Sequence, residues 1–128
     1  MTDPIIDRLD QIKGRADETT EGPWVAEYSK EQGNCVIPHD AHSTREAVAV
    51  TRLFRQQADA EFIAAARTDV PARVDALIRV LERCDRAISF PTPGGEMRQA
   101  CIAMRETAEI IRDEIAVALG VETEGEGR

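Results

Sequence analysis

The segment from residue 58 to residue 81, ADAEFIAAARTDVPARVDALIRVL, constrains the fold of this chain more than any other. Its apolar residues, Phe62 among them, recur every three to four positions, which is the spacing of amphipathic helices. Asp69 can cap a new helix here, and Pro71 would occupy its first turn, where a missing N–H costs little. The segment therefore predicts two helices, over residues 56–67 and 71–89, that build a core and contain no evident chemistry.

The residues before and after this segment predict two further helices. Asp3 and Pro4 are a typical cap and first residue of a helix that ends before Glu18. After the break at residues 90–95, a helix over residues 96–119 stops at Gly120. Its apolar residues exceed what one face of a small domain can cover, so we expect a homodimer through the helices over residues 71–89 and 96–119. The residues behind this expectation are Met97, Met104, Ile110, Ile111, Ile115 and Val117.

A β region lies between the first helix and the segment described above. Residues 24–28 (WVAEY) and 34–38 (NCVIP) are short runs of β-branched and aromatic residues, separated by a five-residue loop that ends in Gly33. Residues 47–51 (AVAVT) are a plausible third strand. We predict an α+β fold, with a small three-stranded antiparallel sheet packed on a bundle of about four helices. A single domain would span residues 1–119, and residues 120–128 would form a disordered acidic tail.

Charge and composition limit the classes of molecule that the chain is expected to bind. Its 128 residues carry a net charge of −8, which argues against nucleic-acid phosphates and anionic membrane surfaces as partners. No apolar run approaches the ~18 residues of a membrane span, and the acidic start does not resemble a signal peptide. With three widely spaced cysteines, the sequence predicts a cytoplasmic protein whose thiols are reduced.

Two stretches carry a resemblance to a known group of proteins. The first is residues 12–24, which read IKGRADETTEGPW, and the second is residues 59–81, with the core string DAEFIAAARTDVP. In this order, with a short β insert between them, they resemble small bacteriophage and prophage accessory proteins of the Ead-like early-region group and their actinobacterial-phage relatives. The resemblance implies a phage-encoded, non-virion protein of the host cytoplasm. It implies no catalytic residues.

Two groups of residues have spacings found among metal ligands. Glu82 with Asp85, and Glu106 with Glu109, have the spacing of Mg²⁺ ligands in nucleotide pyrophosphohydrolases of the MazG type. Their order is reversed here, and neighbouring arginines favour ordinary ion pairs on helix surfaces. The alternative is a zinc site in the segment C-x3-H-x2-H, which lacks an obvious fourth ligand. We expect neither a metal nor another cofactor. The zinc segment comprises Cys35, His39 and His42.

The β insert, residues 24–51, is the most promising part of the chain for binding, because loops on a rigid scaffold often carry function. The predicted binding residues are Trp24, Tyr28, His39, His42 and Arg45. The leading hypothesis is a non-catalytic accessory protein that binds a host protein. A first alternative is sequestration of a small nucleotide immune signal by arginines around the sheet, namely Arg45, Arg52, Arg55 and Arg67. A second alternative is a metal-dependent nucleotide hydrolase.

Overall fold

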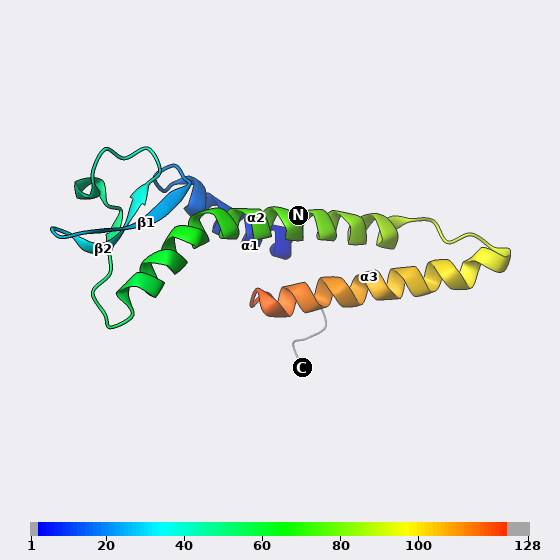
Figure 1. Cartoon of the computed structure of the whole chain (residues 1–128). Coiled ribbons are helices and arrows are strands. Elements are labelled where there is room, and N and C mark those ends of the chain that lie inside the picture. Colours follow the sequence, from blue (N-terminus) through cyan, green and yellow to red (C-terminus); the bar gives the residue numbers. More distant parts are fainter. Residues whose placement is uncertain (1–2, 123–128) are drawn as a thin grey trace. The chain divides into compact units, whose positions relative to one another are not determined.

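The computed structural model describes residues 3–122, which form three α-helices and a three-stranded antiparallel sheet (Figure 1). The helices are α1 (Pro4–Asp17), α2 (Gln56–Ser89) and α3 (Arg98–Ala118). The strands are β1 (Trp24–Ser29), β2 (Gly33–Pro38) and β3 (Ala49–Val50), and two 3-10 turns are η1 (Thr44–Glu46) and η2 (Gly95–Met97). The predicted α+β class is therefore confirmed. Among the described residues, no helix combines the length and apolar character that a membrane span needs.

The chain divides into two compact units, and each is described by itself. The sheet unit comprises residues 12–74, and the helical unit comprises the described residues 3–11 and 75–122. Helices α1 and α2 each supply residues to both units. The single domain over residues 1–119 stays a prediction. Of the predicted tail, residues 123–128 lie outside the described part of the chain.

The predicted count of about four helices is wrong, because residues 56–89 form the single helix α2 with Pro71 inside it. A proline inside a helix removes one hydrogen bond and costs about 3 kcal/mol. Two separate helices would instead leave up to four carbonyls and four amide groups at the joint in need of new partners. Asp69 can satisfy only one or two of these amides as a cap. The alanine-rich flanks of the joint also favour helix.

The sheet has the order β1-β2-β3, and β1 and β2 form the predicted hairpin. Gly33 closes this hairpin with a φ of 74°, a conformation that few residues other than glycine adopt. Strand β3 is shorter than the predicted residues 47–51. Beyond it, the Thr51 N–H still donates to the Asn34 carbonyl of β2 at 3.0 Å, and the Thr51 hydroxyl donates to the Gln56 carbonyl of α2.

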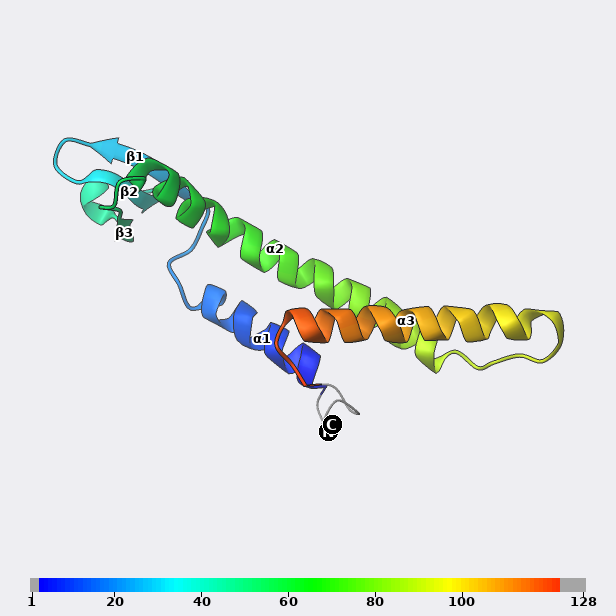
Figure 2. The ribbon, with the colours of Figure 1, turned by 90° about the horizontal axis from the view of Figure 1, so that it is seen from below.

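Different elements pack on the two faces of the sheet. On one face, fully buried Val36 packs with Ala60 and Ala64 of α2 in a small core. Figures 1 and 2 show the sheet beside the first turns of α2. On the other face, Cys35 and Ile37 are buried, and the turn η1 contacts both β1 and β2. The core of this unit is small and consists mainly of aliphatic side chains.

In the helical unit, a hydrogen-bonded ion-pair network connects the start of α1 with α2 and α3. Asp3 caps α1 as predicted, because its carboxylate accepts the Ile5 N–H at 3.0 Å. Arg112 of α3 donates to Asp3 and, at 3.2 Å, to Asp85 of α2. Burial alone would raise the pKa of Asp3, but the hydrogen bonds from Arg112 and Ile5 outweigh it and lower this pKa. The carboxylate is therefore charged at neutral pH and stabilises both contacts.

Gly120 stops helix α3, as predicted from the sequence, two residues after its last helical residue Ala118. Gly120 has a φ of 70°, and its N–H donates to the Val117 carbonyl at 3.0 Å. The Val121 N–H donates to the Ala116 carbonyl at 2.9 Å, which completes a Schellman motif. In the helical unit, α3 runs back along the second half of α2 (Figure 1). The buried apolar residues of this unit are Ile5, Leu9, Leu81, Cys84, Ala108 and Ala116.

Candidate functional site

The candidate site of the sheet unit is organised around one backbone carbonyl, that of Thr20. This oxygen accepts the indole N–H of Trp24 at 3.0 Å and the Nε–H of Arg67 at 3.2 Å. A carbonyl oxygen has two lone pairs, so both are used here. The guanidinium carbon of Arg67 lies 5.9 Å from the centre of the Trp24 ring, within the range of a cation–π contact. The loop before β1 therefore holds Trp24 and Arg67 of α2 in one arrangement.

Gly22 allows this close approach. A Cβ atom added at Gly22 would lie 2.9 Å from Cγ of Arg67, which is closer than two carbon atoms pack. A larger residue at this position would push the Arg67 side chain away from Trp24. The glycine in the Thr-Glu-Gly-Pro-Trp string therefore has a steric explanation.

An open hollow of about 390 Å³ lies next to this contact. Its lining comes from the end of α1, the start of β1 and the middle of α2: Ile12, Arg15, Ala16, Thr19, Trp24, Phe62, Ile63, Ala66, Arg67 and Val70. Most of the lining is apolar, and two arginines border it. Within residues 3–122, the guanidinium group of Arg15 and the terminal nitrogens of Arg67 have no hydrogen-bond or ion-pair partner. The hollow therefore suits an apolar group that carries a negative charge at its edge.

Phe62 is the lining residue that the sequence misassigned. Its place in the apolar stripe predicted a core side chain, yet Phe62 is 74% exposed. The neighbouring Ile63 packs against the Val36 core instead. An alanine-rich helix leaves the direction of its apolar face poorly defined, because small residues suit both core and surface. No local signal marked Phe62 as exposed.

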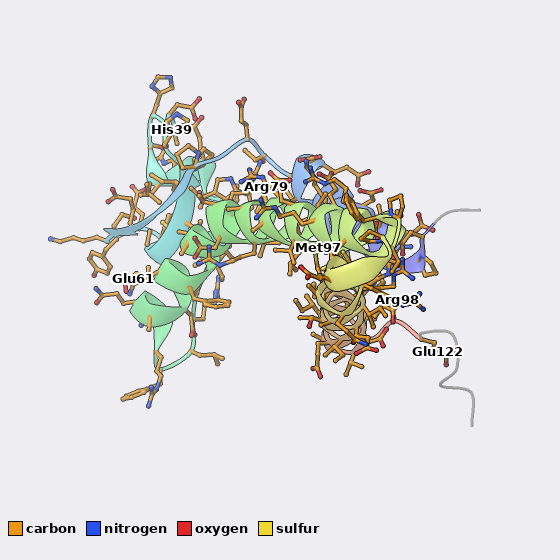
Figure 3. All side chains as sticks on the ribbon, turned by 90° about the vertical axis from the view of Figure 1, so that its right-hand side faces the viewer. His39, Glu61, Arg79, Met97, Arg98 and Glu122 are labelled. Carbon is orange, nitrogen blue, oxygen red and sulfur yellow. The ribbon has the colours of Figure 1, made fainter. Side chains whose placement is uncertain are left out.

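Trp24 is the only one of the five predicted binding residues that lines this hollow. Tyr28, at the far end of β1, is 68% exposed, and Arg45 pairs with Glu31 of the hairpin turn at 3.2 Å. His39 and His42 are also exposed. Figure 3 shows the His39 ring projecting outward. The structure thus leaves the other four residues accessible on the β insert, without gathering them at the hollow.

The geometry around Cys35 does not favour a zinc site. Cys35 is fully buried, and its burial, together with the nearby Glu27 carboxylate, raises the pKa of its thiol. His39 bonds through its ring Nδ1 and its N–H to the Pro23 carbonyl, at 3.3 and 3.0 Å. The backbone N–H of His42 bonds to the Glu46 carboxylate at 2.6 Å. Across residues 3–122, no group of three or more histidine, cysteine or acidic side chains is placed to hold a metal ion.

The carboxylates of the proposed magnesium motif lie mainly on helix surfaces. Glu82, Glu106 and Glu109 are exposed, whereas Asp85 is hydrogen-bonded to Arg112. The same search of the described residues for metal-binding groups finds none that includes these carboxylates. Their spacing is accounted for by helix-surface charge.

The arginines expected around the sheet do not share one hollow. Arg52 and Arg55 line two other shallow depressions, near the hairpin turn and near the start of α2. Arg45 is engaged with Glu31. Arg67 instead shares the Trp24 hollow with Arg15 of α1, a residue outside the expected group. The pair of arginines next to Trp24 therefore differs from the one that the sequence suggested.

Comparison with protein-family models, with curated proteins and with solved structures finds no match to this chain.

Proposed function

We propose that this chain is a non-catalytic accessory protein that binds a host protein through the Trp24 hollow. The observation that carries the proposal is the hollow itself, where Trp24 and exposed Phe62 line an open apolar surface beside Arg15 and Arg67. Tryptophan and arginine are enriched among the residues that dominate binding energy at protein interfaces. The partner segment would insert an apolar side chain and place a carboxylate near the arginines.

The resemblance to phage accessory proteins supports this proposal. The two stretches that carry it, residues 12–24 and 59–81, together supply every residue that lines the hollow. Their contact is direct, since Arg67 of the second stretch donates to Thr20 of the first. We accordingly propose a phage-encoded protein of the host cytoplasm that acts as a homodimer through its helical unit.

Replacing Phe62 by alanine is expected to weaken partner binding at least tenfold, because truncating an interface aromatic commonly removes more than about 1.4 kcal/mol. Stability should change little, since the side chain is 74% exposed. Phe54→Ala is the matched control, because Phe54 is 99% exposed and does not line the hollow. Tagged variants would be used for affinity purification from the host, with the recovered partner quantified by mass spectrometry. Equal recovery with Phe62→Ala and wild type would contradict the assignment.

The double variant His39→Ala/His42→Ala tests the β insert in the same experiment. Both side chains are exposed, so the melting temperature should stay nearly constant. Loss of the partner in this variant alone would move the site from the hollow to the loop around η1. Loss in both variants would indicate one surface that includes the hollow and the loop.

A second candidate function is sequestration of a small nucleotide signal. The observation in its favour is that Trp24, Arg15 and Arg67 line one hollow, whose volume of about 390 Å³ falls within the range of small-ligand pockets. A base would stack on Trp24, and its phosphates would pair with the arginines.

Thermal-shift measurements with cyclic dinucleotides and ADP-ribose derivatives test this candidate. A ligand present at one hundred times its dissociation constant should stabilise the wild type by about 2.7 kcal/mol. Arg15→Ala should lose most of that stabilisation, whereas its unliganded stability should be unchanged because Arg15 is exposed. No shift of the wild type with any of these compounds would exclude this candidate.

A further inference from the structure

Strand β1 forms one edge of the sheet, with β2 on its inner side (Figure 2). The Pro23 carbonyl accepts the His39 N–H at 3.0 Å, so these two residues form a hydrogen-bonded pair. Such pairs alternate along an antiparallel ladder, so every second residue from Val25 to Ser29 bonds to β2 through its backbone. The residues whose N–H and C=O groups point outward are Trp24, Ala26 and Tyr28. In the part of the chain that the structure describes, no hydrogen bond engages these outward groups.

The opposite edge of the sheet is protected, whereas the β1 edge is not. Strand β3 has only two residues, and Thr51 beyond it is hydrogen-bonded to Asn34 and Gln56. Strand β1 has six residues, contains no proline and carries one charged side chain, that of Glu27. Edge strands are usually kept from pairing with other chains by short length, proline, lysine or a bulge. The outer side of β1 is therefore open to a further strand.

The side chains of β1 indicate what such a strand should supply. Trp24 and Ala26 pack against the Val36 core and hold β1 in place. Glu27 is exposed, and within residues 3–122 its carboxylate has no hydrogen-bond or ion-pair partner. Because the Glu27 backbone bonds to β2, a new strand would meet Glu27 in a non-hydrogen-bonded pair, where opposed side chains lie closest. Opposite charges in such a pair stabilise a sheet, so the new strand should place a lysine or arginine there.

A second copy of β1 fits this edge less well than a different protein does. The strand reads WVAEYS and contains no basic residue, so it cannot supply the cation opposite Glu27. In the antiparallel register that sets the two Glu27 residues against each other, like charges would destabilise the pair. The net charge of the chain, −8, also favours the approach of a basic segment.

We propose that β1 is a docking edge for an extended segment of the partner protein, which adds a fourth strand to the sheet through its backbone. A lysine or arginine of that segment, opposite Glu27, fixes the register. This inference deepens the proposed binding of a host protein and rests on it. It uses a different surface from the hollow, to which Trp24 contributes its side chain rather than its backbone.

Binding of synthetic peptides to the full chain tests this edge. The probes are short peptides of alternating valine and threonine that carry lysine or glutamate at the centre. Calorimetry should show several-fold tighter binding of the lysine peptide, and Glu27→Lys should reverse this order, because opposite charges stabilise a cross-strand pair and like charges destabilise it. Equal affinities would overturn the pairing at Glu27. No binding of the lysine peptide at concentrations up to about 1 mM would overturn the docking edge.

Tyr28→Pro tests whether the backbone carries the binding. Proline removes the outward N–H of residue 28 but no hydrogen bond to β2. Tyr28→Ala is the matched control, because it loses the same 68% exposed side chain and keeps the N–H. The proline variant should bind the lysine peptide about tenfold more weakly, whereas the alanine variant should stay close to wild type. Circular dichroism confirms that both variants are folded. Equal losses in both would overturn strand pairing in favour of a side-chain contact.

Two further measurements separate this edge from the other proposed surfaces. Phe62→Ala should bind the lysine peptide as wild type does, because Phe62 lines the hollow and is not part of β1. If Tyr28→Pro recovered the host partner as well as wild type, the docking edge would be overturned and the hollow would stand. Light scattering detects a second copy at the edge. A wild-type dimer that Tyr28→Pro converts to a monomer would overturn the choice of occupant.

Discussion

Replacing Leu81 by alanine is expected to lower the free energy of unfolding by about 2–5 kcal/mol. Leu81 is fully buried in the helical unit, so truncation removes its apolar contacts and leaves a cavity that the surrounding helices fill only in part. Denaturant unfolding followed by circular dichroism measures this loss. Protein concentration must be held fixed, because the stability of the proposed homodimer would rise with concentration.

Arg79→Ala is the matched control for this substitution. Arg79 lies two residues earlier on α2 and is exposed, and it is labelled in Figure 3. Its replacement should change the unfolding free energy by less than about 0.5 kcal/mol. If Leu81→Ala were as mild as this control, the assignment of Leu81 to the core would be wrong.

Replacing Val36 by aspartate is expected to cost more than about 4 kcal/mol, enough to unfold the sheet unit. Val36 is fully buried between Ala60 and Ala64 of α2, and no cation lies among the residues of that cluster to pair with a carboxylate. Trp24, the single tryptophan of the chain, packs against this cluster. Its fluorescence should therefore shift toward that of exposed indole.

Val25→Asp is the control for the sheet. Val25 is on the neighbouring strand and is 37% exposed, so a carboxylate there can reach water and should cost about 1 kcal/mol at most. Equal losses from the two aspartates would indicate that Val36 is not in the core.

The same two core variants test the prediction of a single domain. Because α1 and α2 each contribute residues to both compact units, we expect one cooperative transition that both substitutions lower. Separate transitions, with Leu81→Ala affecting one and Val36→Asp the other, would show that the units unfold independently.

Local patterns predicted most of the fold. Apolar spacing and capping residues predicted α1 and α3, and the β-branched runs around a glycine-ended loop predicted the β1-β2 hairpin, whose connecting loop is shorter in the structure than the predicted five residues. The prediction of a helix break at Pro71 was wrong. Proline is a local signal, whereas the continuity of the helix depends on how many backbone groups a break would leave without hydrogen-bond partners. That sum is not visible in a four-residue window.

The candidate site was less predictable than the fold. Trp24 was identified because it belongs to the β insert, but the hollow beside it depends on contacts between distant parts of the chain. Arg67 meets Thr20 across 47 residues, and Arg15 lies on a different helix. Periodicity cannot show such pairs, nor can it show that Phe62 points to the surface while Ile63 points inward.

The contact at Thr20 has a consequence for how this sequence can vary. The group that binds Trp24 and Arg67 is a main-chain carbonyl, which almost every amino acid supplies, and the Thr20 side chain is exposed. Position 20 should therefore tolerate wide substitution. Position 22 has much less freedom, because any side chain there meets Arg67. Relatives that keep this arrangement should retain glycine at position 22, tryptophan at position 24 and arginine at position 67, whereas the residue at position 20 should vary.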